Sequence, residues 1–180
     1  MQVRIGSSRH TLTEQIGKGG EGDVFRLNST HAVKVYKPDL RSSRESKVRA
    51  MVESRIFENT SLVAFPEAVV LDLNGEFIGF TMKLVKDFKP IHQIYSPKSR
   101  RDEFPQATFN FLVRVAANVA RAVGAVHEAN CVIGDINHSG ILVGQDATVA
   151  LIDADSFQFS FKSETYGCLV GVPDFTPPEL

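Results

Sequence analysis

Two aspartates stand at the ends of a predicted hairpin, where their side chains could act on a phosphate ester. Asp135 precedes the apolar run 141–143, and Asp153 directly follows the apolar run 149–152. The turn-like residues 144–147 join the two runs, so the stretch predicts a tight hairpin. Because a hairpin returns its two ends to the same edge, both carboxylates can face one cleft and suit a magnesium-bound phosphate ester. Alternatively, each aspartate caps a turn.

A glycine-rich run, GKGGEGDV, occupies residues 17–24 between the strand-like segments 11–16 and 24–27. Glycines let the backbone pass close to a ligand, and the backbone N–H groups could then face phosphate oxygens. A plain flexible hairpin is an alternative explanation of the same residues. A strand follows the glycines where a dinucleotide-binding fold requires a helix, so that fold is excluded.

Lys34 lies in the next strand-like segment, residues 31–37. Alternation with a period of two places Lys34 on one face with Ala32 and Tyr36, and the two intervening valines on the other. A lysine in a central strand is costly to bury unless an anion meets it, and the nearby glycines favour a phosphate as that anion. A solvated lysine on an edge strand is the alternative.

Residues 42–58 predict a helix, because apolar residues recur at a spacing of three to four and charges fill the other positions. The apolar stripe consists of Val48, Met51, Val52 and Ile56. One glutamate of this helix could turn inward and pair with Lys34. Glu53 is the first candidate for this pair and Glu45 is the second.

Two further apolar segments, residues 68–73 and 77–82, flank Asn74-Gly75, a dipeptide that favours a two-residue hairpin turn. We therefore expect residues 1–85 to form a five-stranded antiparallel sheet with one helix.

The second part, residues 86–180, contains a long helical pattern from 107 to a stop at Asn130. We expect this helix to support the hairpin that carries the two aspartates, in a mainly helical region. The predicted fold class is α+β, with two parts.

Composition points to an ordinary globular protein. The 180 residues have a net charge of −1, with 43% hydrophobic and 23% charged residues, which gives no strong attraction to nucleic acid or membrane. The two cysteines, Cys131 and Cys168, have no metal-type spacing and suggest no disulfide scaffold. Without a signal-like N-terminus or an apolar run near 18 residues, the expected location is cytoplasmic.

In this order and spacing, the motifs resemble those of a eukaryotic-type protein kinase. The run from Gly17 to Val24 matches G-x-G-x-x-G-x-V, and Ala32-Val33-Lys34 matches the A-x-K strand. Asp135 matches the catalytic-loop aspartate and Asp153 the metal-binding aspartate of D-F-G. Residues 171–179 are similar to G-T-P-x-Y-x-A-P-E.

More narrowly, three segments resemble a bacterial branch of kinase-like proteins: GDINHS at 134–139, IDADSFQ at 152–158 and VPDFTPPEL at 172–180. Members of that branch often carry a helix-hairpin-helix DNA-binding part elsewhere in the chain. Nothing in these residues resembles that part, so no direct nucleic-acid site is expected here.

The resemblance implies ATP and Mg²⁺ as cofactors. It implies that Asp135 orients the attacking hydroxyl and accepts its proton, with Asn137 and Lys34 also catalytic, and that Asp153 and Asp155 hold metal. Adenine would sit against Met82. The implied nucleotide-binding set is Ile16, Gly17, Lys18, Gly19, Gly20, Gly22, Val24, Ala32, Lys34, Glu53, Met82, Lys83, Val85 and Leu142.

Departures from the family pattern predict slow chemistry. Asn137 replaces the family's lysine, and Gly140 replaces an asparagine that normally binds magnesium. Ile133-Gly134 replaces the His-Arg pair before Asp135, which argues against activation through an arginine-bound loop phosphate. Losing one charged contact at a cost of about 1.5–3 kcal/mol would slow the reaction roughly 10- to 150-fold. Asn137 or Asp155 could partly replace the missing ligand.

Three functions are compatible with these residues. The first is ATP-dependent phosphorylation of protein Ser/Thr hydroxyls, and the second is a nucleotide-binding pseudokinase that acts through a regulatory partner. The third is a small-molecule kinase, because Gly134-Asp135 resembles the H-G-D motif of antibiotic phosphotransferases, although Pro177-Pro178-Glu179 argues against it. The fold normally continues beyond Leu180, so we expect an incomplete lower lobe whose apolar surface could self-associate.

Overall fold

A computed structural model describes residues 1–169 and 171, and the chain divides into two compact units. The first unit contains residues 1–58 and 65–84, and the second contains residues 59–64 and those from 85 onward. The expected parts, 1–85 and 86–180, were each continuous, whereas residues 59–64 belong with the second unit. Apart from Gly171, the closing motif at 171–179 lies outside the described residues.

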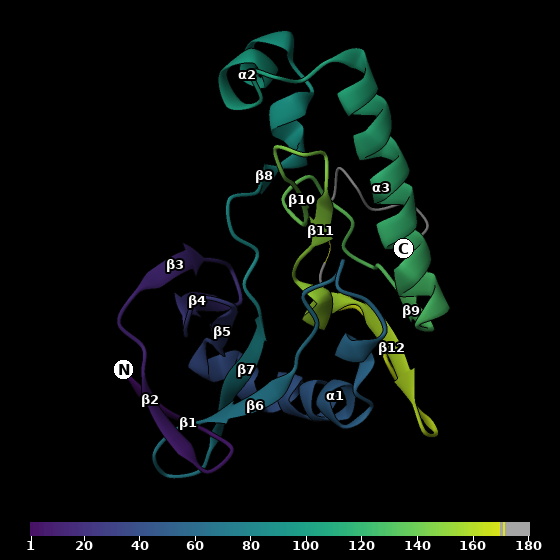
Figure 1. The fold of residues 1–180 in the computed structure, drawn as a ribbon. Helices are drawn as coiled ribbons and strands as arrows, with labels where there is room; N and C mark the ends of the chain where they lie inside the picture. The colour runs from purple at the N-terminus through teal and green to yellow at the C-terminus, as the bar shows by residue number, and fades with distance from the viewer. Residues whose placement is uncertain (170, 172–180) are drawn as a thin grey trace. The chain divides into compact units, whose positions relative to one another are not determined.

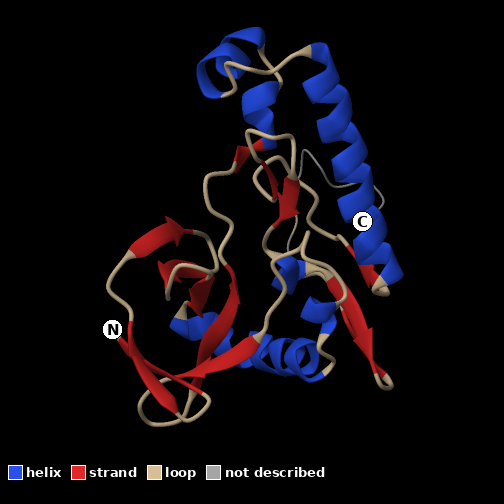
Figure 2. Cartoon of the chain, in the orientation of Figure 1, coloured by secondary structure: helices blue, strands red, loops and turns tan. Residues whose placement is uncertain are grey.

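The first unit is built on one antiparallel sheet (Figures 1 and 2). Its seven strands lie in the order β2-β1-β6-β7-β5-β4-β3. Their bounds are β1 Gln2–Ile5, β2 Ser8–Thr11, β3 Gln15–Lys18, β4 Gly22–Arg26, β5 His31–Tyr36, β6 Ala68–Leu71 and β7 Phe77–Lys83.

The predicted count of five strands is therefore wrong. The N-terminal hairpin of β1 and β2 adds to the five strands β3 to β7, and it pairs with β6 through β1. Strand β2 has the sequence SRHT, without the apolar alternation that marks a strand, so its backbone pairing with β1 stabilises it. Gly6, with a φ of +57°, forms the turn between the two strands.

The two faces of β5 differ as the period-two pattern predicts. Val33 and Val35 pack in a core with Val3, Val70 and Ile78. Lys34 shares the other face with Tyr36, and its Nζ lies 5.6 Å from the centroid of the Tyr36 ring.

Helix α1 (Arg41–Glu53) packs against β6 and β7 and follows a short 3-10 turn, Pro38–Leu40. The predicted helix, 42–58, ends early because Arg55 takes a left-handed φ of +55°. A separate 3-10 turn follows at Ile56–Glu58. The hairpin predicted around Asn74-Gly75 is confirmed, since β6 pairs with β7 in antiparallel register. Its turn is longer than the two residues predicted, because the Asp72 N–H donates to the Glu76 carbonyl at 2.8 Å.

The described part of the second unit contains two α-helices and two small sheets, with strand orders β11-β10-β8 and β13-β12-β9. The helices are α2 Pro97–Glu103 and α3 Phe109–Glu128. The strands are β8 Lys89–Pro90, β9 Cys131–Val132, β10 Ile141–Val143, β11 Val149–Leu151, β12 Gln158–Phe161 and β13 Glu164–Tyr166. Two 3-10 turns, Ile91–Ile94 and Ala154–Ser156, complete it.

Helix α3 packs against β9 and β11, as expected for a support of the hairpin. The Thr108 hydroxyl caps its start, and Asn130 adopts a φ of +55° just beyond its end, which confirms the predicted stop. Among the helices described, α3 alone is long and apolar enough to cross a membrane. Core helices of soluble proteins pass the same test, so a single helix is weak support for a membrane span.

The hairpin between the two aspartates is confirmed. Leu142 of β10 pairs with Ala150 of β11, and β8 pairs with the other edge of β10. The segment 59–64 adds to the free edge of β11, because the Leu151 N–H donates to the Leu62 carbonyl at 2.8 Å and the Leu151 carbonyl accepts the Ala64 N–H at 2.9 Å. These bonds explain why this segment belongs with the second unit.

Candidate active-site residues

Lys34 is buried in the middle of the sheet of the first unit. It lies opposite Val24 of β4 and Phe80 of β7, and only 6% of its surface is exposed. Its Nζ lies 3.8 Å from Oε2 of Glu21, in the glycine-rich turn. The alternative of a solvated lysine on an edge strand is therefore wrong. A buried cation with a carboxylate beside it fits a site for charged groups.

Glu21 also binds Arg44 of α1, and the sequence predicted neither residue. Oε1 of Glu21 accepts hydrogen bonds from Nη2 of Arg44 at 2.5 Å and from Nε at 3.2 Å. The only sequence signal for Glu21 was its place among the glycines. Arg44 had no signal, because a helix start rich in charges resembles any solvated face.

The two glutamates proposed to pair with Lys34 both belong to α1. Glu53 is exposed at the last position of the helix. Glu45 binds Arg49 one turn along the same helix at 2.7 Å. The pair between Glu53 and Lys34 stays a prediction.

The glycines of the turn between β3 and β4 have different surroundings. The Gly19 N–H donates to the Gly22 carbonyl at 2.8 Å and closes the turn. A Cβ on Gly22 would lie 2.2 Å from the Val35 carbonyl oxygen, so the close approach of β5 requires glycine there. A Cβ on Gly20 would meet no atom within 4 Å. Gly22 is thus required for the packing of the sheet, whereas Gly20 faces open space.

The other predicted nucleotide residues are distributed over both units, and their roles stay predictions. In the first unit, Ala32 pairs with Met82 across β5 and β7, and both are buried. Gly17 and Val24 pair across β3 and β4. Ile16, Lys18 and Lys83 are exposed, and the second unit contains the half-buried Val85 and Leu142.

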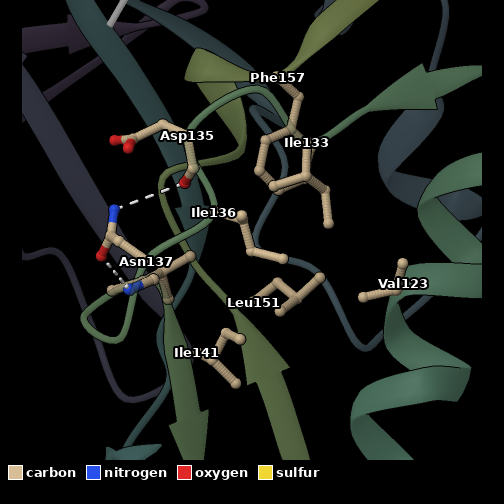
Figure 3. Close-up of a pocket in the computed structure, with 10 residues that line it drawn as sticks. Val123, Ile133, Asp135, Ile136, Asn137, Ile141, Leu151 and Phe157 are labelled. Atoms are coloured by element: carbon tan, nitrogen blue, oxygen red, sulfur yellow. Dashed lines mark hydrogen bonds between the residues drawn. The ribbon is translucent and has the colours of Figure 1, made fainter. Parts of the chain in front are cut away.

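Asp135 lies in the loop between β9 and β10 of the second unit, beside a small pocket (Figure 3). Figure 3 shows its carboxylate directed away from Val123 and Leu151, which line the apolar side of the pocket. Oδ1 of Asp135 is buried and has no hydrogen-bond partner among the described residues. Buried polar atoms are almost always satisfied, so this oxygen marks a position where a ligand or water is expected to bind.

Asn137 holds the loop that follows Asp135. Its Oδ1 accepts hydrogen bonds from the backbone N–H groups of Ser139 at 2.8 Å and Gly140 at 3.1 Å, and Nδ2 lies 3.5 Å from the Asp135 carbonyl. An amide oxygen has two lone pairs, and these two donors use both. Binding a metal through this oxygen would cost a hydrogen bond that shapes the loop.

Asp153 has a strained backbone, with φ +58° and ψ +33°. A left-handed conformation costs an L-residue about 1–2 kcal/mol, and such strain concentrates at functional sites. The residue before it, Ile152, donates its N–H to the Gly140 carbonyl at 3.0 Å. This bond joins the loop after Asp135 to the segment that carries Asp153.

The carboxylates of the second unit suit magnesium only together with phosphate oxygens. The described residues contain no group of three His, Cys, Asp or Glu side chains that could hold a metal ion. Magnesium commonly takes one or two carboxylates plus substrate phosphates and water, so Asp153 and Asp155 can supply the protein part of such a site. Asp153 is exposed, whereas Asp155 is only 2% exposed.

Gly134, directly before Asp135, lies against Cys168. A Cβ on Gly134 would lie 2.2 Å from Cβ and 2.6 Å from Sγ of Cys168. No side chain fits at position 134 unless Cys168 moves. The sequence showed that glycine stands here in place of the family's arginine, but it did not show that Cys168 packs on this glycine.

The buried strand lysine of the first unit and the two aspartates around the hairpin of the second are compatible with a protein kinase-like domain, and similar known proteins support this class. No family model matches the chain. Over 173 residues the chain is 39% identical to protein kinase YegI of Escherichia coli K12, covering 94% of this chain and 27% of that protein.

Weaker similarity extends to two proteins of Caenorhabditis elegans. The serine/threonine-protein kinase sgk-1 is 23% identical over 168 residues, covering 92% of this chain and 36% of that kinase. The serine/threonine-protein kinase akt-1 is 20% identical over 174 residues, covering 92% of this chain and 30% of that kinase. The chain thus spans 27% to 36% of the length of these relatives. Membership of the bacterial branch whose members often carry a helix-hairpin-helix part stays a prediction.

Proposed function

We propose that this chain transfers the γ-phosphoryl group of ATP to Ser or Thr hydroxyls of a protein, with Mg²⁺ as cofactor. The observation that carries the proposal is the buried Lys34, which lies in a central strand next to a glycine-rich turn. The names of the kinase relatives support it at the level of the class. The protein substrate, or a regulatory partner, is part of the same proposal.

Each residue has a defined task in this proposal. Lys34 binds phosphate oxygens, and an ion pair at 4 Å gains roughly 4 kcal/mol at an effective dielectric of about 20. The backbone around Gly20 approaches the phosphates, since its surroundings are open. Asp135 orients the substrate hydroxyl and accepts its proton. Asp153 would hold Mg²⁺, which neutralises charge on the phosphates when bound.

A nucleotide-binding pseudokinase is the second candidate. The observation that favours it is the engaged Oδ1 of Asn137, which the loop uses for two backbone hydrogen bonds. Gly140 stands where the family has a magnesium-binding asparagine, and it has no side chain. Asn137 is therefore a weak substitute for that ligand. The same observation makes a slow kinase the expected form of the first candidate. A small-molecule kinase is the third candidate and rests only on Gly134-Asp135.

Nucleotide binding and phosphoryl transfer are measured separately to test the proposal. Thermal unfolding is followed with ATP, with and without Mg²⁺, and labelled phosphate is then traced into the chain itself, a generic protein and an aminoglycoside. We expect a magnesium-dependent stabilisation that Lys34→Met removes and that Asp135→Asn preserves while abolishing transfer. Lys37→Met is the matched control, because Lys37 is an exposed lysine directly after the same strand.

The outcomes separate the candidates. Stabilisation by ATP without any transfer supports the pseudokinase, and transfer to the aminoglycoside alone supports a small-molecule kinase. No stabilisation of the wild-type chain by ATP would exclude all three candidates, because each of them requires nucleotide binding by these residues.

A further inference from the structure

The carboxylate of Glu21 joins two cations that come from different elements of the first unit. Arg44 of α1 contacts Oε1, and Lys34 of β5 approaches Oε2 at 3.8 Å. The exposed fractions of the three side chains are 21% for Glu21, 12% for Arg44 and 7% for Lys34. Water therefore screens these charges only partly, and their mutual positions matter for the energy.

The backbone around Glu21 fixes where its carboxylate points. The Glu21 carbonyl accepts the N–H of Lys37 at 2.9 Å, just after β5. The next residue, Gly22, has no room for a Cβ against the Val35 carbonyl. Both contacts tie this side of the turn to β5, so the Glu21 side chain is presented to Lys34 by the sheet itself.

Helix α1 presents a cation at this place, whereas a glutamate was expected from it. Arg44 lies near the start of α1 and reaches Glu21. Lys47 is buried on the same helix, Glu45 pairs with Arg49, and Glu53 is exposed. A contact from α1 thus reaches Lys34 through the loop glutamate: Arg44 binds Glu21, and Glu21 approaches Lys34.

We propose that Glu21, held by Arg44, is the positioning residue that orients Lys34 toward the nucleotide phosphates. The glycine-rich turn then supplies a carboxylate to the lysine, and α1 acts on the lysine through an arginine. This inference rests on the proposed function and adds the contacts by which the lysine is positioned: charged side chains connect the turn, the helix and the lysine. Neither Glu21 nor Arg44 needs to touch the transferred group.

Steady-state kinetics of four variants test this role: Glu21→Gln, Arg44→Gln, Glu53→Gln and Glu45→Gln. A lysine that is poorly oriented binds phosphates less tightly before and during the reaction, so KM for ATP should rise while kcat changes little. We expect Glu21→Gln and Arg44→Gln each to raise KM for ATP about tenfold or more, as for loss of one charge-assisted hydrogen bond. Glu45→Gln is the matched control, because it removes one negative charge from α1, as Glu53→Gln does, at a residue that pairs with Arg49.

Two kinetic results would overturn the inference. A rise in KM with Glu53→Gln but not with Glu21→Gln would assign the orienting role to the helix glutamate. A fall in KM with Glu21→Gln would show that Glu21 competes with phosphate for Lys34. Arg44→Lys provides a milder variant, and its KM should lie between those of the wild type and Arg44→Gln.

A measurement without nucleotide separates this inference from the proposed function. Urea unfolding of Glu21→Gln, Arg44→Gln and the double variant forms a double-mutant cycle. Non-additive losses of stability show the Glu21–Arg44 coupling even if the chain binds no ATP; in that case the proposed function fails, and the coupling remains as a contact without the orienting role. Additive losses in a chain that does bind ATP would overturn the inference alone.

Discussion

Replacing Gly134 by alanine should force Cys168 away from the loop that carries Asp135. The new Cβ would lie 2.2 Å from Cβ of Cys168, whereas carbon atoms pack at about 3.5–4.0 Å. Cys168 must therefore retreat by roughly 1.5 Å. Gly134 does not have a positive φ, so the backbone itself accepts alanine and Cys168 is the obstacle. Overpacking of this kind costs about 1–3 kcal/mol.

Two substitutions at Cys168, to alanine and to glycine, test whether the Cβ of Cys168 causes the clash. Cys168→Ala keeps the Cβ that causes the clash, whereas Cys168→Gly removes it. We expect Gly134→Ala to cost about 1–3 kcal/mol in the wild type and in Cys168→Ala, but almost nothing in Cys168→Gly. Equilibrium unfolding in urea measures the three differences. Gly124→Ala on α3 is the control, because its Cβ would meet no atom within 4 Å.

Thiol chemistry reports on the same movement without unfolding the chain. Cys131 is buried and Cys168 is half-buried, so a thiol reagent should modify Cys168 first, and faster in Gly134→Ala. Phosphoryl transfer should fall in the same variant, since Asp135 is the next residue, while stabilisation by ATP should persist. An equal cost of Gly134→Ala in the Cys168→Gly background would refute the reasoning, because the clash would then lie elsewhere.

Three further predictions follow from single contacts. Gly22→Ala should lower the unfolding free energy by about 1–3 kcal/mol, measured in urea, because its Cβ would lie 2.2 Å from the Val35 carbonyl oxygen. Gly140→Asn should raise phosphoryl transfer by roughly 10- to 150-fold, since a Cβ at this position would have no atom nearer than 3.8 Å. No change in the transfer assay would show that a missing metal ligand does not limit the rate. A backbone hydrogen bond from Glu76 is the main cause that lowers the pKa of Asp72 below its ordinary 3.8, so its stabilising effect should be full above pH 3.8 and vanish as the pH falls through the lowered pKa. Unfolding of Asp72→Asn across acid pH should show a smaller loss on acidification.

Local chemistry made much of the fold predictable. The hairpin at Asn74-Gly75, the end of α3 at Asn130 and the two faces of β5 each depend on residues close together in the chain. Turn residues and period-two alternation act over a few positions, so they are visible in one sequence. The buried Lys34 was predictable for the same reason, because its valine neighbours marked a central strand.

Contacts between distant segments were not predictable in this way. The pair of Glu21 and Arg44 joins residues 23 positions apart, and each looks like an ordinary surface charge in the sequence. Strand β2 has no apolar pattern of its own and exists through its backbone pairing with β1. The contact of Gly134 with Cys168 is equally hidden, since a glycine before an aspartate indicates a loop and a lone cysteine indicates nothing specific.

The contact of Gly134 with Cys168 occurs where the chain departs from the protein-kinase pattern, and this coincidence has a physical meaning. A kinase-like domain needs a carboxylate to orient its strand lysine and a fixed segment beside its catalytic loop. The chain lacks an arginine before Asp135, and there Cys168 packs directly on Gly134. In the proposed role of Glu21, the carboxylate comes from the glycine-rich turn. A packing contact has no charge to gain or lose, so the segment at Cys168 would be held without a phosphate, and its position would depend on shape instead of on a phosphorylation state.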